Sequence, residues 1–302
     1  MRLFHHIVIY TIVFVGLLFC QASYAQDSIV TPQKRYVKQT FRNTRFINVP
    51  TVKGQSKGGF EFNITHRFGL INYDENVIKD FFGLDLSSNI RIGFVVPLTK
   101  NLYVGVGRTK FQKTYDFEAN YILMRQTRSW NQPVTVALYH NTAYSTDDFP
   151  PVNEDMYTSD SNLFKYKNLH RFSFYTQLSI ASKLNRSISV QIAPAFTYRN
   201  LVSPNENNYL LSLPSGIRLK TTLFTSLLFE VSPVISKQPK DFFTPMAMSF
   251  EVKTVSHVFQ IVLSNYNSIL NQQMYYSKAK NPFNEGIYLG FNLHKFFYTK
   301  KK

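Results

Sequence analysis

Hydrophobic and polar residues alternate along most of this chain. In residues 60–70, Phe60 and Phe62 fall on one face, while Glu61 and Asn63 fall on the other. A period of two places successive side chains on opposite faces of a β-strand. The same alternation predicts twelve strands: residues 60–70, 90–98, 102–107, 117–123, 134–138, 172–180, 188–198, 211–219, 223–231, 246–252, 259–263 and 287–294.

The lengths and spacing of these strands predict a membrane barrel. Several strands approach the length of about 9–11 residues that a tilted strand needs to cross a bilayer. The connections mostly alternate between short ones, at 99–101 and 184–186, and long ones, at 71–88, 145–168 and 265–285. Short periplasmic turns and long outer loops are typical of bacterial barrels. We therefore predict an all-β fold: a transmembrane antiparallel up-and-down β-barrel of about 12 strands.

A soluble β-sandwich in the periplasm is the rival fold, because its strands also alternate and have one dry face. The polar face here carries Ser, Thr, Gln, Gly and charges of both signs, which suits a lumen. Aromatic residues make up 16% of the chain, with 28 Phe and 19 Tyr. Aromatic girdles at the two membrane faces account for that content, so the composition favours the barrel.

The first 25 residues predict a secretory signal peptide. Arg2 gives a positive start, an apolar run ends at Cys20, and Ala25 precedes the expected cleavage site. The run is too short for a spanning helix, which needs about 20 residues. An uncleaved anchor and a lipoprotein are the alternatives, and the bulky Phe19 argues against the lipoprotein. A cleaved signal predicts export to the cell outer membrane.

The remaining chain divides into three predicted parts. Residues 26–57 form a basic periplasmic N-terminal segment, for which a solvated tail and a plug are both open. The barrel covers residues 58–298, and residues 299–302 form a basic tail. Cys20 is the only cysteine, so the mature chain has no disulfide and no thiolate metal site.

The net charge of +16 raises the question of a nucleic-acid partner. Export argues against one, and the sequence has no helix-turn-helix, zinc-finger spacing or glycine-rich RNA-binding motif. We expect the charge to contact anionic outer-membrane lipid or to favour anions in a lumen. The aromatic end of the last strand, at 296–298, suits recognition by the outer-membrane assembly machinery, although an aromatic girdle explains it equally.

Several short motifs resemble one known family. They are His-Arg-Phe-Gly (66–69), Phe-Phe-Gly-Leu-Asp (81–85), Ser-Asn-Ile-Arg-Ile-Gly (88–93), Val-Gly-Val-Gly-Arg (104–108), Lys-Thr-Tyr-Asp (113–116) and Leu-Met-Arg-Gln (123–126). This quarter of the chain resembles an uncharacterised outer-membrane β-barrel family of Bacteroidota. The resemblance implies fold and location, and it implies no activity and no catalytic residue.

Charged residues on the predicted inner face are the candidate site. Charges that face lipid at the midplane cost about 2–4 kcal/mol each for Arg, so an inward position is favoured. The nine inward candidates are Glu61, Arg67, Arg91, Glu118, Arg171, Arg199, Arg218, Glu230 and Glu251. Paired charges that fill a narrow lumen and a charged ring that selects anions are both open, because twelve strands fall between filled and open barrels.

Three other kinds of site have weaker support in the sequence: a calcium site, a nucleotide-binding loop and a hydrolytic pair. The acidic loop 145–168 suggests calcium, but its spacing matches no ordered calcium loop, so a solvated loop is preferred. Residues 105–108 lack the third glycine of a nucleotide loop. A hydrolytic pair of His140 with Ser173 or Ser179 would have to form in three dimensions, and no Gly-x-Ser-x-Gly elbow exists. We expect no enzyme activity, no catalytic residue, no metal and no cofactor.

Two functions therefore remain for the predicted barrel. The first is a narrow channel or transporter for small solutes, with anions as candidates. The second is a structural or interaction barrel with a filled lumen, whose outer loops bind a partner. A lipid hydrolase of the outer membrane is a third, weaker alternative.

Overall fold

The computed structural model describes residues 35–54, 58–73, 77–149, 151, 164–203, 206–236, 242–277 and 279–298. The predicted signal peptide, residues 26–34 of the basic segment and the basic tail 299–302 lie outside this part. Residues 35–302 form one compact unit. In the described part, no helix has both the length and the apolar character to span a membrane.

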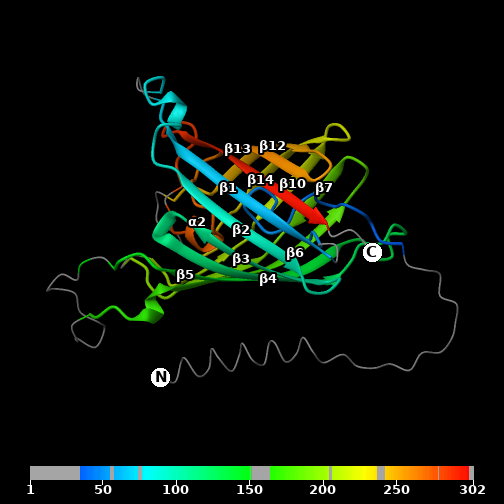
Figure 1. Ribbon diagram of the computed structural model, residues 1–302, viewed down its shortest axis with the longest axis horizontal. Helices are drawn as coiled ribbons and strands as arrows, with labels where there is room; N and C mark the ends of the chain where they lie inside the picture. Colours follow the sequence, from blue (N-terminus) through cyan, green and yellow to red (C-terminus); the bar gives the residue numbers. More distant parts are fainter. Residues whose placement is uncertain are drawn as a thin grey trace. The chain divides into compact units, whose positions relative to one another are not determined.

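The chain forms one continuous antiparallel sheet that closes on itself (Figure 1). Its strands are β1 (Gly59–Ile71), β2 (Asn89–Pro97), β3 (Leu102–Thr109), β4 (Thr114–Met124), β5 (Thr135–Ser145), β6 (Phe172–Lys183), β7 (Ile188–Ile192), β8 (Ala195–Arg199), β9 (Tyr209–Ser212), β10 (Ser215–Lys220), β11 (Thr225–Val231), β12 (Met246–Lys253), β13 (His257–Ser264) and β14 (Ile287–Tyr298). Pairing of β1 with β14, from Gly59↔Tyr298 to Ile71↔Ile287, closes the barrel.

The fourteen segments make twelve strands, as the alternation predicts. Segments β7 and β8 are one strand interrupted at Pro194, and β9 and β10 are one strand interrupted at Pro214. Proline has no N–H to donate to the ladder, which explains both interruptions. The carbonyl of Pro194 still accepts from the Leu178 N–H at 3.0 Å, so pairing continues across the break. The predicted barrel is confirmed.

The two ends of the barrel differ. We call one the turn end; the C-terminal end of β14 lies there, with the connections 98–101, 125–134, 184–187, 221–224 and 254–256. We call the other the loop end; it carries the connections 72–88, 110–113, 146–171, 200–208, 232–245 and 265–286. The long connections 71–88, 145–168 and 265–285 predicted from the sequence all lie at the loop end.

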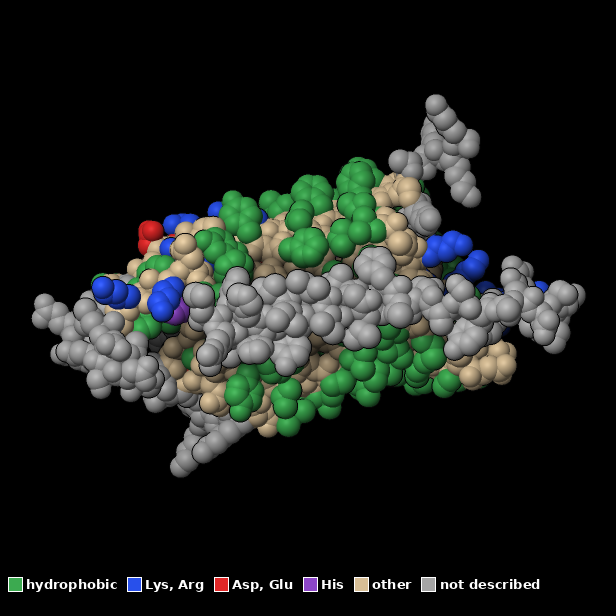
Figure 2. Space-filling model, turned by 90° about the horizontal axis from the view of Figure 1, so that it is seen from below, with side chains coloured by type: hydrophobic (Ala, Val, Ile, Leu, Met, Phe, Trp, Pro, Cys, Tyr) green, Lys and Arg blue, Asp and Glu red, His purple; other side chains and the backbone are tan. Residues whose placement is uncertain are grey.

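The barrel is apolar outside and polar inside. In β1, Glu61, Asn63 and Arg67 are buried, while Phe60 is 40% exposed on the other face. Figure 2 shows hydrophobic side chains gathered on the outer surface, with Lys and Arg toward the two ends. This polarity is the reverse of a soluble β-sandwich and is the one expected for a sheet surrounded by lipid.

Candidate functional site: a lumen filled from both ends

Residues 40–52 lie inside the barrel, and we call them the hairpin plug. Every one of these residues is buried. The segment folds back on itself through a bridge between Arg45 and Pro50, and the Phe46 N–H donates to the Val49 carbonyl at 2.8 Å. A solvated tail is therefore wrong for residues 40–52, and the plug alternative describes them. The reason is that the polar wall of the lumen satisfies a polar segment as well as water does.

Amide side chains of the wall hold the hairpin plug by its backbone. Five of them donate to plug carbonyls over distances of 2.7 to 3.0 Å. The donors are Asn120 on β4, Gln177 on β6, Gln191 on β7, Gln260 on β13 and Asn292 on β14. They bond the carbonyls of Thr51, Pro50, Pro50, Phe46 and Ile47, respectively. The collar runs around the barrel, so the plug is held from several sides.

Glu230 on β11 binds the tip of the hairpin plug. Its Oε2 accepts from the backbone N–H groups of Ile47, Asn48 and Val49 at 3.0, 3.0 and 3.1 Å. Successive N–H groups that converge in this way form an anion-binding concavity. The other oxygen, Oε1, accepts from the Tyr266 hydroxyl at 3.2 Å. One carboxylate therefore joins the hairpin plug to the β13–β14 connection.

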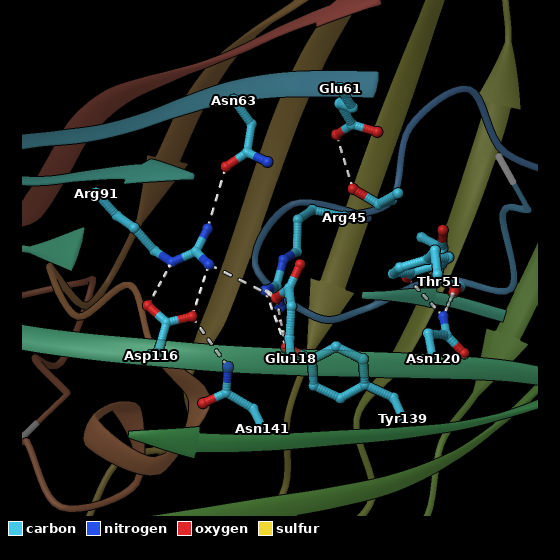
Figure 3. A network of polar contacts seen from close by, with 12 residues as sticks. Arg45, Thr51, Glu61, Asn63, Arg91, Asp116, Glu118, Asn120, Tyr139 and Asn141 are labelled. Atoms are coloured by element: carbon cyan, nitrogen blue, oxygen red, sulfur yellow. Dashed lines mark hydrogen bonds and ion pairs between the residues drawn. The ribbon is translucent and has the colours of Figure 1, made fainter. Parts of the chain in front are cut away.

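A first charge network lies where β2 and β4 face the plug (Figure 3). Arg91 makes two parallel bonds to Asp116, with Nε–Oδ1 at 3.0 Å and Nη2–Oδ2 at 2.7 Å. The same guanidinium lies 3.6 Å from Glu118, which also binds Arg45 of the plug. Arg45 donates in addition to the Tyr139 hydroxyl at 3.0 Å. Paired and hydrogen-bonded charges of this kind are the form in which ions are tolerated away from water.

A second network lies on the opposite wall. Arg218 Nε donates to Glu251 Oε1 at 3.1 Å, and Arg42 of the plug lies 3.6 Å from the same oxygen. Arg42 also donates to the carbonyl of Leu223 at 3.0 Å, at the turn end of the barrel.

Glu61 is the fourth wall carboxylate that reaches the plug. It accepts from the Thr44 hydroxyl at 2.7 Å and contacts His294 Nδ1 at 2.6 Å. Like Glu118 and Glu251, it therefore has a partner on the plug and at least one on the wall.

The β13–β14 connection fills the other half of the lumen. We call residues 265–277 the loop plug; it includes the short helix α2 (Asn271–Met274). Tyr266, Leu270 and Met274 are at most 3% exposed. The two plugs touch, since Asn48 Nδ2 lies 3.7 Å from Met274 Sδ.

Seven of the nine predicted inward charges lie in this filled lumen. They are Glu61, Arg67, Arg91, Glu118, Arg218, Glu230 and Glu251, all buried. Arg67 is fully buried and forms no ion pair with a residue in the described ranges; its Nη1 donates to Asn292 Oδ1 at 2.9 Å. Arg171 and Arg199 lie half-buried at the loop end, with Arg171 in the turn that precedes β6.

Asp116 and the plug residues Arg42 and Arg45 were not among the residues predicted from the sequence. Asp116 lies two residues before Glu118, so the alternation could have found it had the strand been started earlier. The plug residues carry no periodic signal.

Two other sites considered from the sequence are the acidic loop 145–168 and the hydrolytic pair of His140 with a serine. Of the acidic loop 145–168, the described part holds Asp147 and Asp148, and a hydrogen bond from Lys113 at 2.9 Å holds the pKa of Asp147 below its usual range. No group of three metal-ligating side chains occurs among the described residues.

His140 bonds Thr176 and Thr142 on the outward face, whereas Ser179 is buried on the inner face. Ser173 is paired with Ala143 and lines a cavity at the loop end, so the structure brings His140 together with neither serine.

Comparison with known proteins gives a family but no specific activity. No curated protein matches the chain. Among solved structures, similarity extends to "NanC porin structure in rhombohedral crystal form" (TM-score 0.48, 6% identity, 80% of this chain, 99% of that chain) and to "KdgM porin" (TM-score 0.44, 6% identity, 80% and 99%). It also extends to "CymD monoaromatic hydrocarbon channel" (TM-score 0.30, 11% identity, 71% and 52%).

A family profile provides the assignment. The profile described as "Membrane bound beta barrel domain (DUF5777)" matches residues 41–297. The match begins inside the hairpin plug, so it includes most of the plug as well as all strands. The chain belongs to this family of membrane-bound β-barrel domains.

Proposed function

We propose that this protein is an outer-membrane channel for small solutes, closed by the hairpin plug and opened when that plug leaves the lumen and the loop plug rearranges at the loop end. The observation that carries the proposal is the chemistry of the wall around the plug. The wall is lined by amides, hydroxyls and paired charges, which water can solvate once the plug has gone.

Each wall carboxylate that binds the hairpin plug also has a partner on the barrel side. Glu118 has Arg91 and Glu251 has Arg218, at 3.6 and 3.1 Å. Glu61 has His294, and the loop-plug residue Tyr266 remains on Glu230. When the plug withdraws, each of these four carboxylates therefore keeps its partner on the wall or on the loop plug.

The amide collar behaves in the same way. Each amide exchanges a bond to a plug carbonyl for a bond to water, and the net value of such a bond is only about 0.5–1.5 kcal/mol. The apolar plug residues Phe41 and Phe46 oppose withdrawal, since a buried phenylalanine contributes roughly 1.5–3 kcal/mol. Closed and open states then differ by an amount that a ligand or a partner can supply.

A permanently filled barrel is the second candidate, and the loop plug favours it. Both halves of the lumen are occupied, and buried aromatic residues such as Tyr139 and Tyr175 pack with the plugs. In that case the loop end would serve contact with a partner. Conductance separates the two candidates.

Location and orientation complete the proposal. The long connections at the loop end face outward and both chain ends face the periplasm, which is the arrangement of bacterial barrels. Export by a cleaved signal peptide, contact with outer-membrane lipid, assembly by the outer-membrane machinery and an origin in Bacteroidota stay predictions.

The test is planar-bilayer recording of the purified chain and of a variant that lacks residues 40–52. We expect rare, brief openings for the intact chain and sustained conductance steps for the deletion variant. Circular dichroism and heat-modified gel mobility check that the deleted chain still forms a barrel. A folded deletion variant without conductance would overturn the channel and support the filled barrel.

A further inference from the structure

The loop end contains a cavity of about 250 Å³ that the plug mechanism does not use. It lies where β4, β5, β6 and β8 meet the loop plug. Its polar lining includes Thr114, Asp148, Arg171, Ser173, Arg199 and Gln273. We propose that this cavity binds a small hydroxylated carboxylate, of the size and chemistry of a single sugar acid.

Gln273 gives the first reason. The residue is 4% exposed, and its Nε2 donates to Thr114 Oγ1 at 3.1 Å. Its Oε1 is buried and has no hydrogen-bond partner in the described part of the chain. Buried side-chain oxygens are nearly always satisfied, so this acceptor calls for a donor. A ligand hydroxyl in the cavity supplies one.

Arg199 gives the second reason. Its guanidinium lies 4.9 Å from the centre of the Tyr276 ring and forms no hydrogen bond or ion pair with any described residue. The Tyr276 hydroxyl donates to the Asn207 carbonyl at 2.8 Å, which fixes the ring that supports the guanidinium. A guanidinium that stacks on a ring keeps its N–H edge for a planar carboxylate.

Arg171 adds a second cation on the same cavity. Its guanidinium lies 4.0 Å from the centre of the Phe149 ring. Nη1 donates to the carbonyls of Ser145 and Asp147 at 3.1 and 2.5 Å. These two bonds position the group and use one of its three nitrogens.

The charge balance selects an anion over a cation. Asp147 is paired with Lys113 at 2.9 Å, so its charge is already offset. Among the lining residues, two arginines then face one remaining carboxylate, that of Asp148, while Glu206 lies outside the lining and interacts electrostatically with Arg199. Asp148 can accept a ligand hydroxyl, as Gln273 can, so the lining suits a molecule with one carboxylate and several hydroxyls. The volume is below the roughly 300–1,000 Å³ of common ligand pockets, which limits the ligand to about one ring.

Ligand binding in this cavity does not require the barrel to conduct. A failure of this proposal can therefore be distinguished from a failure of the proposed channel. The experiment is titration calorimetry of the full chain in detergent with D-glucuronate, glucose and acetate. Glucose keeps the ring and lacks the carboxylate, and acetate keeps the carboxylate and lacks the hydroxyls. We expect glucuronate to bind at least about tenfold more tightly than either, as one charge-assisted bond implies.

Variants test the assigned residues. Arg199→Gln and Arg171→Gln each weaken glucuronate binding roughly tenfold or more. Gln273→Leu weakens glucuronate and leaves acetate unchanged. Arg108→Gln is the matched control, because Arg108 lies exposed on β3 outside the cavity and stacks on Tyr115 at 5.6 Å. No binding of glucuronate, equal binding of glucose, or equal losses in Arg108→Gln and Arg199→Gln would overturn the site.

Discussion

The hairpin plug and the loop plug occupy the same lumen but are attached in different ways. Both flanks of the hairpin plug leave at the turn end, where the Val37 N–H donates to the Gln126 carbonyl at 2.9 Å and Gly59 begins β1. The loop plug is fixed at both ends to neighbouring strands, since β13 ends at Ser264 and β14 begins at Ile287. A hairpin with both flanks on one side can leave as a unit, whereas the loop plug can only rearrange. The difference suggests that one segment gates the lumen and the other shapes it.

The largest expected effect is on the free energy of unfolding, and it tests whether the loop plug opens independently of the hairpin plug. Leu270→Ala leaves a cavity in the loop plug, where Leu270 is 3% exposed, and we expect a loss of about 2–5 kcal/mol. Denaturant unfolding measures that loss. Hydrogen exchange should then speed up at 265–277 and stay unchanged at 44–51. Equal acceleration in both segments would show that the plugs open together.

Glu230→Gln should act on both plugs, because this carboxylate binds three N–H groups of one and the hydroxyl of the other. Loss of the charge weakens these bonds by roughly 2–3 kcal/mol in total, so amide exchange at Ile47, Asn48 and Val49 rises by about 30- to 160-fold. Glu206→Gln removes the same charge at the loop end and serves as the control. Unchanged exchange at the hairpin tip in Glu230→Gln would contradict the linking role.

Gln191→Leu is a smaller perturbation, confined to the hairpin plug. Its Nε2 donates only to the Pro50 carbonyl, which Gln177 also bonds, and its Oε1 has no partner among the described residues. We expect hairpin exchange to change by at most about 1 kcal/mol, with no change in the loop plug. A larger effect than that of Glu230→Gln would mean that the amide collar, and not the carboxylate, holds the hairpin.

The smallest effect concerns acid at the loop end. The bond from Lys113 lowers the pKa of Asp147, so the contribution of this pair is present above the unfolded pKa of about 3.9 and is lost as the pH falls through the lower folded value. Amide exchange of residues 147–149 should therefore rise at acid pH relative to residues 44–51, once intrinsic rates are corrected. Lys113→Gln should show the looser loop already at neutral pH. A pH response that persists in that variant would assign the effect to another group.

The barrel wall was predictable from the sequence, and its contents were not. Strict alternation, as in Glu61, Asn63 and Arg67 of β1, identifies the inner face because lipid outside and polar groups inside impose a period of two. The same alternation predicts inward positions for Glu230 and Glu251, and both are buried in the structure. In contrast, Arg42 and Arg45 lie in a segment whose basic composition favours a solvated tail. Burial in a polar lumen imposes no hydrophobic periodicity on the chain, so the sequence carries no sign of the burial.

The cavity at the loop end could be predicted only in part from the sequence. Arg171 and Arg199 were expected to line a lumen, but the sequence does not reveal that aromatic rings support both guanidinium groups. Gln273 could not be foreseen at all. It lies in the connection between β13 and β14, and no hydrophobic periodicity marks that such a connection folds into the lumen.

Locking the hairpin plug in place tests the central claim most directly. Thr44 and Glu61 lie 2.7 Å apart by their side-chain oxygens, and Cys20 is the only natural cysteine, so Thr44→Cys and Glu61→Cys with Cys20→Ser give one defined pair of thiols, which a short bifunctional reagent joins through two reducible disulfides. In a Glu230→Gln background, planar-bilayer recording should find the cross-linked chain silent and the reduced chain conducting. Equal conductance before and after reduction would contradict a lumen gated by residues 40–52.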